Sequence, residues 1–549
     1  MPKKPLKSEL LAPAGSLEKL KTAIKYGADA VYIGTPDLSL RTKSKITLED
    51  LIEAVAFTHK YGKRIYLTLN LFTHNSDIEK LPIFLETIKK VKPDGLIVAD
   101  PAIFQYFKDN TKNIELHIST QANISSWLSV NYWKDQGASL CVMARETSFT
   151  ELKEIKKKCP DIKIESFVHG AMCMTYSGRC LLSNFMAERG ANQGNCAHSC
   201  RWHYKLHLKL RDGSLKELVV NEDNQELFEF LLEEEYRPGE FMPIEEDLRG
   251  SYILNSKDLC LMPKLNEYLE IGIDSLKIEG RNKSEYYLAI ATKSYRNAMD
   301  DWAKDPDNWN PAKYMAELDS LANRGYTLAF HEGLLTNFAH NYESAKSASI
   351  YEYAGIISEV NNDHFILEVK NRLVAGDVLE FICPPQFNNI LLRIYEFIQM
   401  PRDNNSEEQI VSVINPGFKP KIKIYFSAFP EEDPEIIKKS LTENIVVRKE
   451  KPLTKDELLR LKLDLEARKQ EQNIGYIENY EKTKDELIAA IDADLKDKHY
   501  RTPRIGKEGC CGKGCNGCLI FWHEDKYQKA RELLKTKKAG ELLEKSETA

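Results

Sequence analysis

The 549-residue sequence has no long run of apolar side chains. No stretch approaches the roughly 20 apolar residues that a helix needs to span a bilayer. The opening residues, MPKKPLKSELLAPAGS, contain lysines but no apolar segment of the length that a secretory signal requires. We therefore expect a cytoplasmic protein that makes no membrane contact.

The sequence also lacks an excess of positive charge, because its formal net charge is −6. A nucleic-acid partner would have to bind a local basic patch, since the chain as a whole is not basic. Several catalytic signatures are missing as well. There is no Gly-x-Gly-x-x-Gly after the first predicted strand, no His-Glu-x-x-His and no Gly-x-Ser-x-Gly.

Cysteine is present in quantity, with twelve residues that fall mostly into two groups. Clustered cysteines in a chain of this size favour a reducing compartment and metal binding over disulfides. Four further cysteines are isolated in sequence, and we expect them to be core thiols: Cys141, Cys159, Cys260 and Cys383.

The first group lies in residues 165–201, ESFVHGAMCMTYSGRCLLSNFMAERGANQGNCAHSCR, and comprises Cys173, Cys180, Cys196 and Cys200. Thiolates gathered by a glycine-rich loop suit zinc or an iron–sulfur cluster. Structural zinc sites usually have two short Cys-x2–4-Cys pairs, and only the last two cysteines approach that spacing. The wide first gap therefore favours a cluster, with buried free cysteines as the alternative.

Around this group, apolar runs alternate with amphipathic stretches, which indicates an α/β fold. The predicted strands are 9–12, 30–33, 64–69, 95–99, 115–118, 139–143, 163–168 and 274–278, and the helices between them include 16–26, 48–61, 77–91 and 284–302. Eight strand–helix units in about 300 residues match a TIM-like (β/α)8 barrel. The alternative is a doubly wound open sheet.

We expect four regions along the chain. Residues 1–340 form the barrel domain, with a Cys-rich insertion at about 170–255 after strand seven, and residues 341–432 form a small β-barrel domain. Residues 433–500 are a charged helical segment, and residues 501–549 form a helical, Cys-containing tail. The tail cysteines Cys510, Cys511, Cys515 and Cys518 could bind a second cluster or zinc, or act as a redox dithiol.

Several stretches resemble the collagenase-like peptidase U-32 family, and within it the branch of prephenate-dependent tRNA uridine hydroxylases. They include ELLAPAG, YGADAVYIG, HISTQAN, FVHGAMCMTYSGRCLLS, NQGNCAHSCRW, SLKIEGRNKSEYY and NRGYT, and they cover roughly residues 8–430. The resemblance implies a 4Fe–4S cluster on Cys173, Cys180, Cys196 and Cys200, with Cys260 as an alternative fourth ligand. It also implies oxygen-independent hydroxylation of the tRNA wobble uridine to 5-hydroxyuridine, with prephenate as oxygen donor.

Polar residues follow most of the predicted strands, on the face where barrel enzymes build their active sites. A dicarboxylate such as prephenate needs cationic groups, for which Arg145, Arg281 and Arg41 are candidates. Glu279 and His169 could transfer protons, and His117 and Gln121 could orient the substrate. The alternatives are a collagenase-like peptidase or a hydroxylase of rRNA or another substrate. The oligomeric state is left open.

Overall fold

The computed structural model describes residues 8–35, 46–70, 73–173, 256–333, 349–401, 407–429 and 434–451, together with short stretches between 176 and 252. The described residues form two compact units. The first holds the chain up to Tyr351 together with Ile382–Asn388, and the second holds Glu352–Phe381 and Asn389–Lys449.

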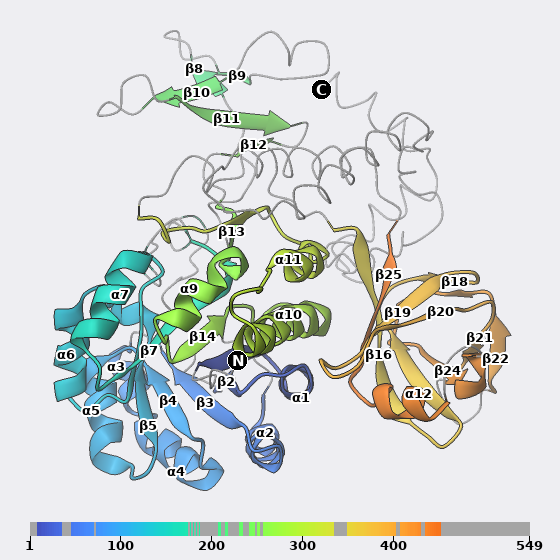
Figure 1. Ribbon diagram of the computed structural model, residues 1–549, viewed down its shortest axis with the longest axis horizontal. Coiled ribbons are helices and arrows are strands. Elements are labelled where there is room, and N and C mark those ends of the chain that lie inside the picture. The colour runs from blue at the N-terminus through green and yellow to red at the C-terminus, as the bar shows by residue number, and fades with distance from the viewer. Residues whose placement is uncertain are drawn as a thin grey trace. The chain divides into compact units, whose positions relative to one another are not determined.

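The first unit is a closed parallel barrel, as the sequence predicts (Figure 1). Its ring strands are β1 (Glu9–Ala14), β2 (Ala30–Gly34), β3 (Arg64–Leu69), β4 (Gly95–Val98), β5 (Glu115–Ile118), β6 (Leu140–Val142), β7 (Lys163–Ala171) and β14 (Ser275–Ile278). Each strand from β1 to β7 pairs in parallel with the next. Strand β14 closes the ring, because it pairs with both β1 and β7.

Helices surround the strands, and side-chain caps fix where several of them begin. The helices of this unit are α1 (Leu17–Lys25), α2 (Leu48–Lys60), α3 (Asn75–Ile78), α4 (Leu81–Val91), α5 (Pro101–Asn110), α6 (Trp127–Asp135), α7 (Phe149–Lys158), α9 (Leu265–Glu270), α10 (Glu285–Lys304) and α11 (Ala312–Asp319). Thr47 and Ser148 form capping boxes at α2 and α7. No helix in the described part of the chain combines the length and apolar character needed to cross a bilayer.

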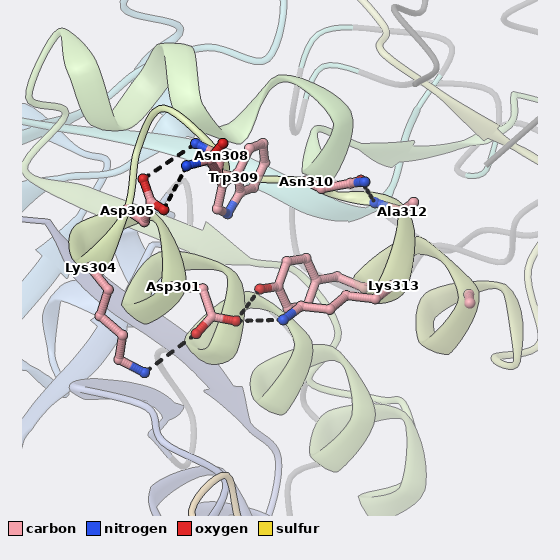
Figure 2. A pocket seen from close by; sticks show the side chains of 10 residues that line it. Asp301, Lys304, Asp305, Asn308, Trp309, Asn310, Ala312 and Lys313 are labelled. Atoms are coloured by element: carbon pink, nitrogen blue, oxygen red, sulfur yellow. Dashed lines mark hydrogen bonds and ion pairs between the residues drawn. The ribbon is translucent and has the colours of Figure 1, made fainter. Parts of the chain in front are cut away.

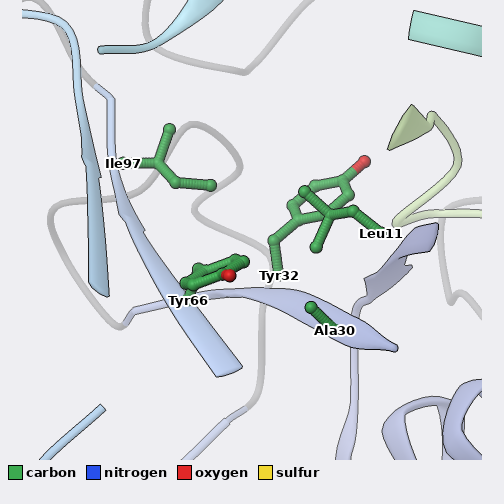
Figure 3. Packing of buried hydrophobic residues seen from close by; sticks show 5 residues of the cluster. All are labelled: Leu11, Ala30, Tyr32, Tyr66 and Ile97. Carbon is green, nitrogen blue, oxygen red and sulfur yellow. The ribbon is translucent and has the colours of Figure 1, made fainter. Parts of the chain in front are cut away.

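The ring is filled by side chains from its inner face. Leu11, Ala30, Tyr32, Tyr66 and Ile97 project from β1 to β4 and pack together, each at most 3% exposed (Figure 3). Because strand side chains alternate between faces, the neighbours of these residues pack outward against the helices. The two tyrosines bring hydroxyl groups into this cluster of apolar side chains.

Between β7 and β14 the chain forms several short strands, β8 (His207–Lys209), β9 (Leu215–Glu217), β10 (Phe230–Glu233), β11 (Phe241–Asp247), β12 (Gly250–Tyr252) and β13 (Asp258–Cys260). Strands β8 and β9 form one antiparallel pair, and β10, β11 and β12 form a separate sheet. Strand β13 runs antiparallel to the end of β7, and β15 (Tyr326–Thr327) lies beside it. The insertion predicted from the sequence, at about 170–255, ends before β13. The sequence prediction did not include the return of this strand to β7.

The second unit is a curled antiparallel sheet of eight strands, in the order β20-β19-β25-β16-β17-β24-β21-β22. Its elements are β16 (Tyr351–Val360), β17 (His364–Val369), β18 (Leu373–Val374), β19 (Val378–Ile382), β20 (Ile390–Arg393), β21 (Phe397–Gln399), β22 (Gln409–Val411), β23 (Val413–Ile414), β24 (Lys421–Tyr425), α12 (Pro434–Ser440) and β25 (Val446–Glu450). Strand β25 corrects the sequence prediction, which assigned its residues to a charged helical segment. The non-local pairing of β25 with β16 and β19 outweighs the local charge pattern there.

Candidate functional site at the barrel mouth

Three of the predicted polar residues meet around Tyr32, at the carboxyl ends of the ring strands. The Glu279 carboxylate lies 3.3 Å from the Tyr32 hydroxyl and 3.7 Å from the Arg145 guanidinium. The Arg281 guanidinium lies over the Tyr32 ring and donates to the Thr68 hydroxyl at 2.8 Å. Two guanidinium groups and one carboxylate from the loops after β6 and β14 therefore share one small region.

A second aromatic ring supports this group from β7. The Arg145 guanidinium lies 3.8 Å from the centre of the Phe167 ring, which is close enough for a strong cation–π contact. Stacking on a fixed ring restrains the plane of the guanidinium. A restrained guanidinium loses little further freedom when it binds a planar carboxylate.

A buried ion pair lies beside the same two rings. The Lys277 ammonium is 2.7 Å from the Glu165 carboxylate, which also accepts a hydrogen bond from Ser275 at 2.9 Å. Side-chain exposure is 6% for Lys277 and 0% for Glu165. Neither Lys277 nor Glu165 is among the site residues predicted from the sequence. The sequence did offer a signal for them, because Glu165 and Lys277 are charged residues inside the apolar runs IESFV and SLKIEG.

The backbone of Glu279 is held from both sides. Its amide donates to the carbonyl of His169 at 2.8 Å, and its carbonyl accepts from the Tyr287 hydroxyl at 2.9 Å. Gly170 packs so closely that a Cβ there would lie 2.6 Å from the Glu279 carbonyl oxygen. Its φ of +117° is also a conformation that only glycine adopts readily. These contacts fix the backbone position from which the Glu279 side chain projects, just after β14.

His169 itself lies among aromatic residues of α10 and β15. Its ring is 5.4 to 5.8 Å from the rings of Tyr287, Tyr295 and Tyr326, and neither ring nitrogen has a hydrogen-bond partner. Burial lowers the pKa of His169 to about 4, so the imidazole is neutral at pH 7. This packing does not favour the predicted role of His169 in proton transfer, which stays a prediction.

The two residues predicted to orient substrate differ in their surroundings. His117 is fully buried in the ring, where it pairs with Glu115 at 3.0 Å and packs on Tyr66. Gln121 follows β5, is 6% exposed, and its side-chain carbonyl oxygen has no hydrogen-bond partner. The next loop holds a similar group in Glu146, where burial raises the pKa and one carboxylate oxygen is unpartnered. Such buried acceptors are suited to bind a donor group of a ligand.

Cys173 is the one member of the first cysteine group within the described residues, and it lies exposed just beyond β7. Cys260, on β13, is buried, with its sulfur 3.9 Å from the Tyr295 hydroxyl and 3.7 Å from the Met315 sulfur. Within the described ranges, no three cysteine, histidine or carboxylate side chains are grouped as metal ligands. The remaining predicted residues lie outside these ranges: Arg41, Cys180, Cys196, Cys200, Cys510, Cys511, Cys515 and Cys518.

A surface pocket of about 680 Å³ lies between the end of α10 and α11 (Figure 2). Asp301 accepts hydrogen bonds from Lys313 and Tyr314 there, and Trp309 donates to the carbonyl of Ala298. None of the predicted site residues lines it. Its polar groups bind one another and stabilise the turn between the two helices.

Comparison with known proteins finds matches that cover more than half of the chain. The model of peptidase family U32 matches residues 15–337. The chain is 39% identical to "tRNA hydroxylation protein P1" of Bacillus subtilis over 382 residues, which are 69% of this chain and 84% of that protein. It is 37% identical to "tRNA hydroxylation protein P" of Haemophilus influenzae over 438 residues, which are 75% and 92% of the two chains.

The name of a more distant relative gives a different RNA as its substrate. The chain is 29% identical to "23S rRNA 5-hydroxycytidine C2501 synthase" of Escherichia coli over 381 residues, which are 68% of this chain and 52% of that protein. The match of the family model extends from the loop after β1 to beyond β15 and so includes the whole barrel mouth. The chain therefore belongs to peptidase family U32.

Proposed function

We propose that this protein hydroxylates tRNA at the mouth of its barrel. The observation that carries the proposal is the meeting of Arg145, Arg281 and Glu279 around Tyr32, at the end of the barrel where enzymes of this fold carry out chemistry. The names of the two relatives with 37% and 39% identity support the choice of tRNA as the substrate.

In its finer form, the reaction would convert the wobble uridine to 5-hydroxyuridine without molecular oxygen, and prephenate would donate the oxygen atom. The anticodon base would be unstacked to reach the mouth, because chemistry on a base needs access to its edge or face. Arg145 and Arg281 would bind the two carboxylates of prephenate, since guanidinium groups form bidentate contacts with carboxylates. Glu279 would accept or return a proton, and the Tyr32 hydroxyl would hold that carboxylate in place.

The cofactor in this proposal is a 4Fe–4S cluster on Cys173, Cys180, Cys196 and Cys200. The donor set fits, because four thiolates are the usual ligands of such a cluster, and Cys173 is exposed where the insertion leaves the mouth. When bound, the cluster would supply electrons or polarise the oxygen donor. The packing of Cys260 against Tyr295 and Met315 favours Cys200 over Cys260 as the fourth ligand.

Nucleoside analysis of tRNA tests the reaction directly. A strain that lacks this gene should lose 5-hydroxyuridine, and the wild-type gene should restore it. Arg281→Ala should reduce the product about a hundredfold, equivalent to about 3 kcal/mol of lost transition-state binding. Arg393→Ala is the matched control, because Arg393 is an exposed residue of the sheet unit. Full activity of a folded Arg281→Ala protein would rule out Arg281 as a carboxylate-binding residue.

Anaerobic purification with iron and sulfide analysis tests the cofactor. We expect about four irons per chain from the first cysteine group and a broad visible absorption that Cys173→Ala removes. A colourless protein that contains zinc or no metal would reject the redox mechanism. Peptidase activity would then become the leading alternative.

Two alternatives remain open to the same assays. If the deletion removes a hydroxylated nucleoside from rRNA and not from tRNA, the substrate is rRNA. The name of the Escherichia coli relative suggests this alternative. A peptidase would need a nucleophile beside a base. Neither ring nitrogen of His169 has a partner, and His117 pairs with Glu115, so these two histidines do not activate a nucleophile in this conformation.

A further inference from the structure

The rings of Tyr32 and Phe167 connect the charged side chains of the barrel mouth into one series of contacts. Arg281 lies 5.9 Å from the centre of the Tyr32 ring, and Arg145 lies 3.8 Å from the centre of the Phe167 ring. Lys277 lies over both rings, 4.5 Å from Tyr32 and 5.4 Å from Phe167. Among the described residues it is the cation that the two rings share.

The position of the Lys277 ammonium is set by its ion pair with Glu165. The strand register places both residues on neighbouring strands of the ring, since β14 pairs directly with β7. A buried ion pair contributes little net stability, because desolvation of the two charges offsets their attraction. Stability alone is therefore a weak reason for this pair to lie in the barrel. Its contacts with the two rings offer a better one.

We propose that Lys277 is a positioning residue of the site. Held by Glu165, its ammonium fixes the two rings on which Arg145 and Arg281 rest, and so sets the spacing of the two guanidinium groups. That spacing decides how well a small dicarboxylate is bound. The inference rests on the proposed function, because it takes the co-substrate to be a dicarboxylate such as prephenate.

A double substitution distinguishes the positioning effect of Lys277 from the effect of its positive charge on dicarboxylate binding. Lys277→Met with Glu165→Gln removes one positive and one negative charge, so the net charge of the site is unchanged. It also leaves no unpaired buried charge, which a single substitution would. The matched control is Lys156→Met with Asp274→Asn. That ion pair, at 2.6 Å, lies at the amino end of the same strand, just before β14.

The measurements are calorimetric binding of prephenate to anaerobically purified holoenzyme, and separate KM values for prephenate and for tRNA. The Lys277/Glu165 double variant should raise the prephenate Kd and KM about tenfold or more, because small displacements of binding groups cost large factors. Its KM for tRNA should stay within about twofold of the wild-type value. The Lys156/Asp274 control should leave both values unchanged. General loss of structure would not separate the two substrates in this way.

Unchanged prephenate affinity in a folded double variant would overturn the inference. Should that variant fail to fold, Phe167→Leu provides the second test, because it removes one ring and keeps the ion pair. Here too, wild-type affinity for prephenate would overturn the inference. A wild-type protein that binds prephenate but does not hydroxylate tRNA would reject the proposed function alone. A wild-type protein that hydroxylates tRNA but does not bind prephenate would reject the inference and prephenate as the oxygen donor, and would leave the hydroxylation in place.

Discussion

Glu9 is a carboxylate at the amino end of the barrel interior, away from the mouth. The Tyr66 hydroxyl lies 3.0 and 3.1 Å from its two oxygens, and Arg64 lies 3.8 Å away. Burial raises the pKa of Glu9 from 4.5 to about 7, against the opposing effects of Arg64 and Tyr66, with Glu165 and Asp29 adding to the rise. The folded protein therefore keeps a proton on Glu9 that the unfolded chain releases above about pH 4.5.

This difference predicts how Glu9→Gln changes stability with pH. Between pH 4.5 and 7 the wild-type unfolding free energy should fall because of Glu9, by at most about 3 kcal/mol. The glutamine cannot ionise, so the variant should gain stability relative to wild type as the pH rises from 5 to 8. Urea unfolding of both proteins at these two pH values measures the change. Parallel stability curves would contradict the shifted pKa of Glu9.

Among individual residues, some of those at the barrel mouth could be predicted from the sequence. Arg145, Glu279 and Arg281 were predicted from their positions after strands, and the structure brings them together around Tyr32. Lys277 was not predicted, because a single lysine inside an apolar strand does not reveal which face it occupies. The inward face is fixed only when β14 pairs with β1 and β7, which lie far away in the sequence.

The junction of β7 and β14 is an element whose exact shape matters to the site. Its register shifts between Lys277 and Ile278, next to the close contact of Gly170 with Glu279. Gly170→Ala should therefore displace Glu279 and reduce hydroxylation about a hundredfold. Gly272→Ala is the control, because Gly272 also has a positive φ, +71°, but no atom within 4 Å of the added Cβ.

Kinetics and thermal unfolding of both variants distinguish the two effects. Gly272→Ala should lose about 1 kcal/mol of stability from backbone strain alone. Gly170→Ala should lose more, because its Cβ would also collide with Glu279, and it alone should lose activity. Equal activity losses in the two variants would show that strain, and not the position of Glu279, controls the reaction.

The elements of the barrel were predicted well, for a physical reason. Buried parallel strands are nearly continuous apolar runs, and these stand out between amphipathic helices. Strands β3 and β5 begin and end at the predicted residues. Strand β25 was missed because VVRKE lies in a stretch of alternating lysine and glutamate. Its partner β16 ends about 85 residues earlier, so no local pattern indicates the pairing.

At the scale of the whole molecule, the two cysteine groups predict how much metal the chain holds. If Cys510, Cys511, Cys515 and Cys518 bind a second cluster, the wild-type protein should contain about eight irons per chain. Cys515→Ala with Cys518→Ala should then reduce the number to about four and leave the absorption of the first cluster in place. Iron and zinc analysis of both proteins checks this. Four irons without zinc in the wild type would exclude a metal in the tail.

The closure of the ring by β14 has a consequence for the order of events during synthesis. About a hundred residues separate the end of β7 from the start of β14. At about 5 to 20 residues per second, the ribosome needs roughly 5 to 20 s to add them. During that interval β1 and β7 each present an unpaired edge, which other strands could bind. The cysteines of the insertion therefore leave the ribosome before β14 is synthesised, when the ring of strands is not yet closed.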